Sequence, residues 1–327
     1  MAVYTLVSKK DLKLLLKQYN LGELKEFYGI VEGVENSNYM LKTTSGKFIL
    51  TIFEKRVNTD EIPYFLSLLD HLNKNKVKCP IAIKRNDGNI LSTIKNKQAS
   101  IFTYLTGNWS KNPDSKQCEL IGETLANLHN AGKGFNLIRY NNFGIQEWSS
   151  LLLKASTNAE SLQKGLYNEI NLISKIIISE WPKNLPYGNI HADLFPDNVF
   201  FRNNKVSGII DFYFSCNDYY AYDIAICINS WCFENNFSLN INKLSNLLNS
   251  YNSVRPLSIH EIQALPVLMA GASLRFLLTR LIDYSLDKKN VKLKIKDPKE
   301  YLIKLHYHVN SLIPNIYGFL GKKKRNG

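Results

Sequence analysis

One short segment of the chain combines residue types and a spacing that suit phosphoryl transfer. It reads Asn-Ile-His-Ala-Asp-Leu-Phe-Pro-Asp-Asn over residues 189–198, and Asp211 follows in the run Gly-Ile-Ile-Asp-Phe. Phosphoryl transfer needs a carboxylate that orients the attacking hydroxyl and accepts its proton, and oxygen ligands for Mg²⁺. Asp193, Asn198 and Asp211 supply those groups. The sequence therefore predicts a small-molecule kinase that uses ATP, with Asp193 as the catalytic base.

The spacing of these residues indicates how their oxygen atoms can meet. Asp193 and Asn198 would lie at the two ends of one tight loop, and a hairpin over residues 199–210 would return Asp211 to the same place. A lone His-x-Asp pair would be a weaker signal, because buried His and Asp side chains often only satisfy each other. His191 is accordingly interpreted as a scaffold residue that hydrogen-bonds the loop.

The elements that must position this loop begin with a β-rich stretch. Runs typical of strands, separated by turn signals, lie at residues 27–31, 39–42, 48–53 and 99–105. Ser45-Gly46 reads as a hairpin turn, and Asn86-Asp87-Gly88 reads as a turn between two further strands. A helix is expected after Thr59 or Asp60, either of which can cap it.

Beyond Gly107 the apolar spacing becomes helical. Helices are expected between Pro113 and Gly132 and over residues 162–181, 219–234, 241–251, 258–286 and 298–312. A β-rich part followed by a helical part predicts an α+β fold with two lobes, not a doubly wound sheet. The expected lobes are 1–106, which binds the nucleotide, and 107–327, which carries the catalytic loop and the acceptor pocket.

Composition narrows the class of protein. The 327 residues are 45% hydrophobic and 21% charged, as in an ordinary globular protein with more than one core. No run of 18 apolar residues suits a membrane span, and the first 20 residues lack the pattern of a signal peptide. The five cysteines are scattered, as is usual for a reducing compartment. We therefore expect a cytoplasmic protein without a membrane partner.

The net charge of +13 raises the alternative of a nucleic-acid-binding protein. The lysines, however, are spread along the chain, and only residues 322–325 form a basic run. A dispersed excess gives no continuous surface for a phosphate backbone, so no nucleic-acid partner is expected. The oligomeric state is left open.

Several segments together resemble a known family. They lie at residues 32–39, 48–56, 191–201, 210–214, 222–227 and 274–280, and so extend over nearly the whole chain. The string His-Ala-Asp-Leu-Phe-Pro-Asp-Asn followed by Ile-Asp-Phe-Tyr is the most specific of them. The chain resembles the superfamily of aminoglycoside phosphotransferases and choline kinases, relatives of the protein kinases. Within it, the chain is most similar to the bacterial homoserine kinases of this fold, which are unrelated to the GHMP type.

The resemblance implies a reaction and a set of site residues. ATP and L-homoserine would give ADP and O-phospho-L-homoserine, a step toward threonine. Asp193 would be the base, and Asn198 and Asp211 would hold Mg²⁺. The resemblance also implies a loop over the phosphates and a hinge that offers main-chain groups to adenine; their residues are Gly33, Asn36, Ser37 and Asn38, and Phe102, Thr103, Tyr104 and Leu105.

The chain departs from the kinase pattern at two positions. The phosphate loop has one glycine, Gly33, where protein kinases have three, so main-chain N–H groups and Ser37 would bind the phosphates. Thr51 also occupies the position where the strand lysine of protein kinases is expected. Lys55 lies on the same side of the strand four residues later, if the strand extends that far, and is the candidate replacement.

The sequence offers several candidates for the residues that bind the acceptor. Homoserine carries an ammonium and a carboxylate, so its pocket should offer both an acid and a base. Asp218, Tyr222, Trp231 and Arg275 are the candidates; Asp223 and Glu234 are further acids, and Arg280 is a further base. Another amino or sugar alcohol, such as choline, an aminoglycoside or methylthioribose, remains possible as acceptor. A pseudokinase that only binds nucleotide is a further alternative.

Overall fold

The computed structural model describes residues 4–31, 36–54, 58–284 and 296–312. The chain divides into two compact units. The first unit contains Met1–Trp109 and Asn198–Tyr213, and the second contains Ser110–Asp197 and Phe214–Gly327. The predicted division after residue 106 stays a prediction. In the structure the first unit extends three residues further and takes in a segment from the middle of the sequence.

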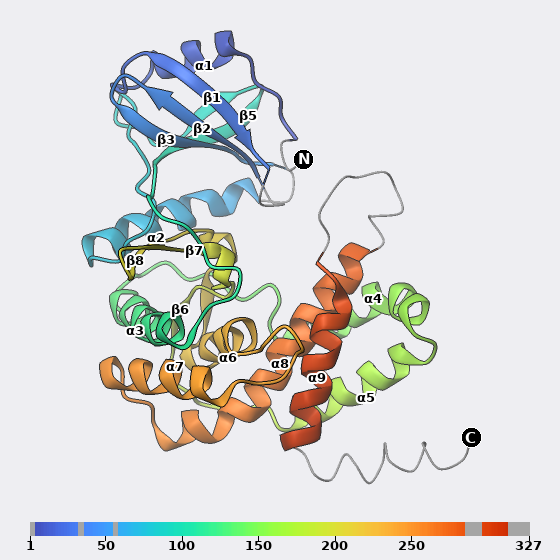
Figure 1. Ribbon diagram of the computed structural model, residues 1–327. Helices are drawn as coiled ribbons and strands as arrows, with labels where there is room; N and C mark the ends of the chain where they lie inside the picture. The colour runs from blue at the N-terminus through green and yellow to red at the C-terminus, as the bar shows by residue number, and fades with distance from the viewer. Residues whose placement is uncertain (1–3, 32–35, 55–57, 285–295, 313–327) are drawn as a thin grey trace. The chain divides into compact units, whose positions relative to one another are not determined.

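A five-stranded antiparallel sheet forms the body of the first unit (Figure 1). Its order is β1-β2-β3-β5-β4, with bounds Leu24–Ile30, Ser37–Thr43, Gly46–Ile52, Lys97–Thr103 and Ser92–Ile94. The three strands expected in the first 53 residues are confirmed, as is the hairpin turn before Gly46. Helix α1 (Lys9–Leu16) buries Leu12, Leu15 and Leu16 in the core that the sheet also lines. Its capping box joins Ser8 and Asp11.

The next part of the first unit differs from the expectation at two places. Helix α2 (Ile62–Lys74) follows a short 3₁₀ turn, η1 (Thr59–Glu61), where a helix was expected. The predicted cap at Thr59 or Asp60 is wrong, because the Asn58 side chain caps the 3₁₀ turn and Glu61 precedes α2 without a capping hydrogen bond. Asn86-Asp87-Gly88 is a turn, but the predicted strand before it is wrong, because only an isolated bridge joins Ala82 to Phe102. The β4–β5 hairpin instead turns at Lys95 and Asn96, whose φ angles are 50° and 59°. A lysine in the left-handed region carries little turn signal in a sequence.

A second hairpin completes the first unit. Strands β7 (Val199–Arg202) and β8 (Lys205–Ile209) pair antiparallel, which confirms the hairpin expected there. Asn203 and Asn204 form its two-residue turn with φ angles of 51° and 54°. Two consecutive residues with positive φ are typical of a type I′ turn, for which asparagine is well suited.

The second unit is mostly helical, which confirms the predicted α+β class. Its helices are α3 (Ser115–Ala131), α4 (Trp148–Leu162), α5 (Leu166–Ser179), α6 (Tyr220–Trp231), α7 (Ile241–Val254), α8 (Ile259–Tyr284) and α9 (Pro298–Leu312). A short 3₁₀ turn lies at Ile145–Glu147, and two more, Pro196–Asn198 and Phe212–Phe214, lie where the chain passes from one unit to the other. Helix α4 was not predicted, nor was the antiparallel pair of β6 (Tyr187–Ile190) with β9 (Cys216–Tyr219).

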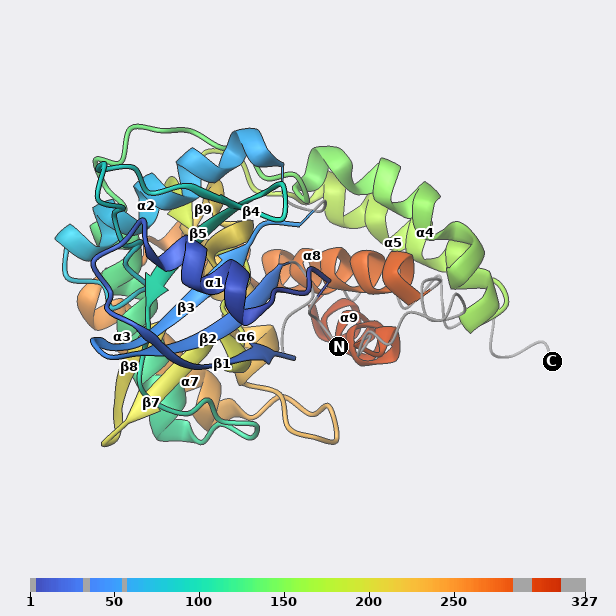
Figure 2. The same ribbon diagram turned by 90° about the horizontal axis from the view of Figure 1, so that it is seen from above.

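Helix α8 is the central helix of the second unit. It contacts α4, α5, α6 and α9, and Figures 1 and 2 show it beside α9 and the α4–α5 pair. By length and composition it is the one helix of the described residues that could cross a bilayer, with a mean hydropathy of 1.5 over 18 residues. However, 78% of that window is buried inside the protein. A helix apolar on all sides and covered by other helices is typical of a protein core.

Candidate active site

The loop that carries Asp193 begins where β6 ends and is held by a buried carboxylate. Asp223, in the first turn of α6, is fully buried. Its Oδ2 accepts a hydrogen bond from the main-chain N of His191 at 2.8 Å, and its Oδ1 accepts one from the N of Ala192 at 2.9 Å. Ala192 has a φ of 62°, a conformation that costs a non-glycine residue about 1 kcal/mol. Asp223 therefore holds the residue before Asp193 in a strained backbone conformation.

His191 and Trp231 support the same loop from inside. His191 is fully buried, and its Nδ1 accepts a hydrogen bond from the N of Asp193 at 3.3 Å, which confirms its interpretation as a scaffold residue. Trp231 is also fully buried, and its Nε1 donates to the carbonyl of Leu194 at 2.8 Å. This contact gives Trp231 a loop-supporting role. Its predicted contact with the acceptor gains no support from the geometry.

A buried histidine contacts the Asp223 carboxylate behind the loop. The Nε2 of His129 lies 3.1 Å from Oδ2 of Asp223, and both side chains are fully buried. Burial alone would raise the pKa of Asp223, but the hydrogen bonds from His129 and from the N of His191 hold it below its usual value. Burial lowers the pKa of His129. Asp223 is thus an ionised acceptor at neutral pH that holds the catalytic loop, whereas the sequence offered it only as a further acid for the acceptor pocket.

The predicted magnesium ligands belong to the first unit. The N of Ile210 donates to the carbonyl of Asn198 at 2.9 Å, and Val199 pairs with Ile209, so the β7–β8 hairpin brings the neighbourhoods of Asn198 and Asp211 together. Asp211 has a φ of 67°, so it lies in the left-handed region as Ala192 does. Among the described residues no three His, Cys, Asp or Glu side chains gather as a metal site. One carboxylate and one amide still suit Mg²⁺, which commonly takes its other ligands from water and phosphate.

The predicted adenine hinge leaves strand β5 in the first unit. Phe102 is buried, and Thr103 exchanges hydrogen bonds with Ile81 through its N and its Oγ1. Within the described part of the chain, no main-chain hydrogen bond joins Tyr104 or Leu105 to another residue. Contact of this segment with the edge of a purine stays a prediction.

Two of the residues predicted to contact the phosphates, Gly33 of the loop and Lys55 after the third strand, lie outside the described residues. Ser37 is fully buried, and its hydroxyl accepts from the N of Tyr4 and of Thr5 and donates to Glu54. A phosphate contact from this hydroxyl would have to displace one of those bonds.

The neighbouring amides also have internal partners. The Oδ1 of Asn36 accepts from the N of Glu54 at 3.2 Å, and the Oδ1 of Asn38 accepts from Thr51 Oγ1 at 2.8 Å. Lys97 forms an ion pair with Glu54. Thr51, which occupies the position expected for a strand lysine, thus hydrogen-bonds Asn38 through its hydroxyl. Phosphate contact by Asn36, Ser37 and Asn38 stays a prediction.

Two arginines on α8 have different surroundings. Arg280 donates to Glu300 Oε2 at 2.7 Å, so it belongs to an ion pair between α8 and α9. Arg275 is only 5% exposed, and no carboxylate of the described residues lies within ion-pair distance of it. Its guanidinium lies instead 3.9 Å from the ring centroid of Phe276 and 4.6 Å from that of Phe143. A nearly buried cation among aromatic rings is a candidate for binding an anionic group.

An acidic candidate is joined to this arginine through one short segment. Asn141 Nδ2 donates to Asp218 Oδ2 at 2.7 Å, and Asn141 Oδ1 accepts from the N of Phe143, whose ring packs on Arg275. Burial raises the pKa of Asp218. Tyr222 is buried, and its hydroxyl has no hydrogen-bond partner among the described residues. The structure thus gathers Asp218 and Arg275 around one loop and leaves Trp231 with the catalytic loop.

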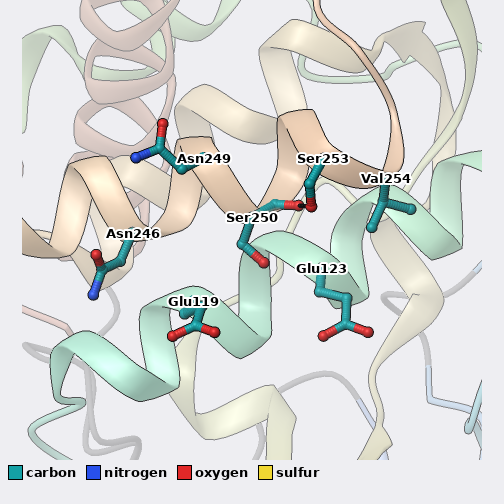
Figure 3. A pocket seen from close by; sticks show the side chains of 7 residues that line it. All are labelled: Glu119, Glu123, Asn246, Asn249, Ser250, Ser253 and Val254. Atoms are coloured by element: carbon teal, nitrogen blue, oxygen red, sulfur yellow. Dashed lines mark hydrogen bonds between the residues drawn. The ribbon is translucent and has the colours of Figure 1, made fainter.

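Two surface hollows of the second unit lie apart from all predicted site residues. One, of about 400 Å³, lies between α3 and α7 and is lined by polar side chains that include Glu119, Glu123 and Asn246 (Figure 3). The other, of about 550 Å³, is lined by residues that include Lys133, Arg255 and Glu261. Neither is lined by a residue that the sequence predicted for the catalytic, nucleotide or acceptor site.

Comparisons with known proteins identify the family of the chain. The model of the family described as "Phosphotransferase enzyme family" matches residues 27–257. A curated protein named homoserine kinase from Rhizobium meliloti (strain 1021) is 47% identical over 94% of this chain and 94% of its own length. A second, from Bradyrhizobium sp. (strain ORS 278), is also 47% identical over 94% of this chain and 95% of its own.

Solved structures show the same fold. A spectinomycin phosphotransferase in complex with ADP and spectinomycin has a TM-score of 0.67 and 14% identity, over 95% of this chain and 96% of that one. A microcompartment-associated aminopropanol kinase has a TM-score of 0.61 and 16% identity, over 93% and 95%. These likenesses confirm the predicted kinase-like two-lobed fold.

Proposed function

The chain belongs to the phosphotransferase enzyme family, and we propose that it transfers the γ-phosphoryl group of ATP to the hydroxyl of L-homoserine, giving O-phospho-L-homoserine. The observation that carries the acceptor is the 47% identity to curated homoserine kinases over 94% of the chain. The fold alone would not decide it, because structural neighbours phosphorylate chemically different alcohols, as the names of a spectinomycin phosphotransferase and an aminopropanol kinase state. The reaction would be a step in threonine biosynthesis, in the cytoplasm.

Asp193 is the proposed catalytic base. It would accept the proton of the homoserine hydroxyl while that oxygen forms a bond to the γ-phosphorus and the bond to the leaving ADP oxygen breaks. Asp223 and His191 hold the loop so that the carboxylate keeps one orientation. Asn198 and Asp211 are the proposed Mg²⁺ ligands, and a bound Mg²⁺ would neutralise charge on the phosphates.

ATP would be bound by the first unit. Phe102, Thr103, Tyr104 and Leu105 are proposed to face adenine, and the segment with Gly33, Asn36, Ser37 and Asn38 to cover the phosphates. Thr51 stands where protein kinases have a strand lysine. Lys55 is therefore proposed as the cation that contacts the phosphates.

The acceptor would be bound by the second unit as a zwitterion. Arg275 is proposed to bind the carboxylate and Asp218 the ammonium of homoserine, with Tyr222 nearby as a buried hydroxyl. Arg275 supports homoserine over choline or a sugar alcohol, because those acceptors have no carboxylate to pair with a nearly buried guanidinium.

An acceptor panel with Mg²⁺ and ATP tests the proposal. The panel contains L-homoserine, choline, 3-aminopropan-1-ol, methylthioribose and an aminoglycoside, and product formation is followed by ADP release and by phosphorus NMR. The expected result is a kcat/KM for homoserine at least 100-fold above that for every other acceptor. Strong turnover of choline with none of homoserine would refute the acceptor, and no phosphoryl transfer to any acceptor would favour a pseudokinase.

A further inference from the structure

A chain of buried hydrogen bonds extends from Asp223 away from the catalytic loop. His129 is fully buried and uses both ring nitrogens, with Nε2 at 3.1 Å from Asp223 Oδ2 and Nδ1 at 2.7 Å from the hydroxyl of Tyr251. Tyr251, on α7, is fully buried, and its hydroxyl also lies 3.1 Å from Nη1 of Arg255. Arg255 in turn pairs with Glu261 at 2.9 Å. All these residues belong to the second unit.

The last residue of this series of hydrogen bonds, Glu261, lies at the start of α8. Glu261 is 1% exposed, and its other oxygen accepts hydrogen bonds from the N and the hydroxyl of Ser258 at 2.9 and 3.0 Å. Arg255 is further enclosed by the rings of Tyr220 and Tyr251, at 4.5 and 5.8 Å from their centroids. The guanidinium therefore has a fixed place beside the Tyr251 hydroxyl.

The chemistry of the donors decides where each proton lies. A guanidinium can only donate, so the oxygen of Tyr251 accepts from Arg255, and its own O–H is left to donate to His129 Nδ1. The neutral His129 ring, whose pKa burial lowers, then carries its proton on Nε2. That N–H points to the carboxylate of Asp223, which accepts it.

We propose that Tyr251 and Arg255 are positioning residues for phosphoryl transfer, which act by locking His129 in the Nε2–H tautomer. The proposal rests on the proposed function, since it concerns the placement of Asp193. In the opposite tautomer the lone pair of Nε2 would face the Asp223 carboxylate, and the two would repel each other. Asp223 would then hold the strained Ala192 less firmly, and Asp193 would lose its fixed orientation.

The same series of hydrogen bonds connects the catalytic loop with the helix that carries Arg275. Glu261 lies in the first turn of α8, and Arg275 lies on the same helix fourteen residues later. Both residues belong to the one helix Ile259–Tyr284, with Pro266 between them. Through Arg255 and Tyr251, the helix that carries the proposed carboxylate ligand is tied to the loop that carries the proposed base.

The substitution Tyr251→Phe tests the proposal, because it removes one hydroxyl and keeps the ring. The expected result is a kcat for homoserine that falls at least tenfold, while KM for ATP and for homoserine stays within about twofold. Tyr301→Phe is the matched control: Tyr301 is also fully buried, but its hydroxyl has no partner among the described residues, so its kcat should not change.

The tautomer of His129 is read separately, from ¹⁵N chemical shifts of selectively labelled protein. The wild type should show the proton on Nε2, and Tyr251→Phe should show a mixture of tautomers. A wild-type ring protonated on Nδ1 would overturn the proposal, even if the variant does not fold. So would a variant that loses thermal stability but keeps the kcat of the wild type per folded molecule. If the wild type does not phosphorylate homoserine, the proposed function fails, whereas the ¹⁵N result still decides the tautomer.

Discussion

The contrast between Arg275 and Arg280 gives the sharpest prediction, because both lie on α8 and both are almost buried. Replacing each by methionine keeps the length and apolar volume of the side chain and removes only the charge. For Arg275→Met we expect a large loss of homoserine turnover with little loss of stability. For Arg280→Met we expect the reverse, since Arg280 pairs with Glu300 and is not proposed to contact the acceptor.

The magnitude for activity comes from one charge-assisted interaction. A hydrogen bond between charged groups contributes about 1.5–3 kcal/mol, which corresponds to a loss of roughly 10- to 150-fold in kcat/KM for homoserine. The acceptor 3-aminopropan-1-ol is homoserine without its carboxylate. For 3-aminopropan-1-ol, kcat/KM should be low with the wild type and equally low with Arg275→Met. This acceptor has no carboxylate for Arg275 to bind, so removing the arginine has no further effect.

The magnitudes for stability have opposite origins at the two positions. Arg275→Met loses cation–π contacts of about 2 kcal/mol each to Phe276 and Phe143 at this nearly buried site. It also removes a charge that has no ion-pair partner among the described residues and whose burial costs several kcal/mol, so the two effects oppose each other and the net change should stay within about 1 kcal/mol. Arg280→Met breaks a partly buried pair. Because Lys304 still binds Glu300 at 2.6 Å, we expect a loss of about 2–4 kcal/mol, toward the low end for a buried pair.

The assay combines steady-state kinetics for both acceptors with urea unfolding of the three proteins. The proposed role of Arg275 would be refuted if Arg275→Met lost no more than threefold in kcat/KM for homoserine. It would also be refuted if the variant lost turnover of homoserine and 3-aminopropan-1-ol by the same factor. In the second case the arginine would support the site as a whole and not the carboxylate.

Three further predictions follow from single contacts. Asp193→Ala should abolish turnover but leave ATP affinity within about twofold by calorimetry, and residual turnover within tenfold of wild type would remove Asp193 from the role of base. Although Glu300 is partly buried, Arg280 and Lys304 lower its pKa to about 2 from 4.5; the pair therefore stabilises the fold above pH 4.5 and is lost as pH falls toward 2, so in acid unfolding Glu300→Gln should show a shallower loss of stability across that window. Gly271→Ala should cost about 1–3 kcal/mol in thermal unfolding, because the new methyl group would lie 2.3 Å from the ring of Trp181, and an unchanged midpoint would contradict that packing.

The parts of the fold that sequence patterns predicted are those with a local signal. The β7–β8 hairpin was predictable because two asparagines tolerate the positive φ angles of its turn. The helices α3, α6, α7, α8 and α9 were predictable from apolar spacing. The β6–β9 pair was not, because its two four-residue strands lie more than twenty residues apart and the whole β7–β8 hairpin lies between them.

The site divides in the same way. The spacing of Asp193, Asn198 and Asp211 is a property of one continuous segment, so the sequence by itself indicated phosphoryl transfer and the residues proposed for it. The neighbours of Ser37 and Asp223 are not local. Ser37 had the residue type of a phosphate ligand, but folding buries its hydroxyl among Tyr4, Thr5 and Glu54.

What the sequence alone determined is therefore the chemistry, through residue types at short fixed separations and through likeness to a family of phosphotransferases. What only the tertiary structure decided is which polar side chains already have partners. Arg275 and Arg280 are both arginines on the same apolar helix, and the sequence pattern does not distinguish them. They differ because Glu300, on another helix, pairs with Arg280. Asp223 likewise becomes the support of the catalytic loop only when α6 packs behind β6. Pairings between distant segments depend on packing, which no local pattern encodes.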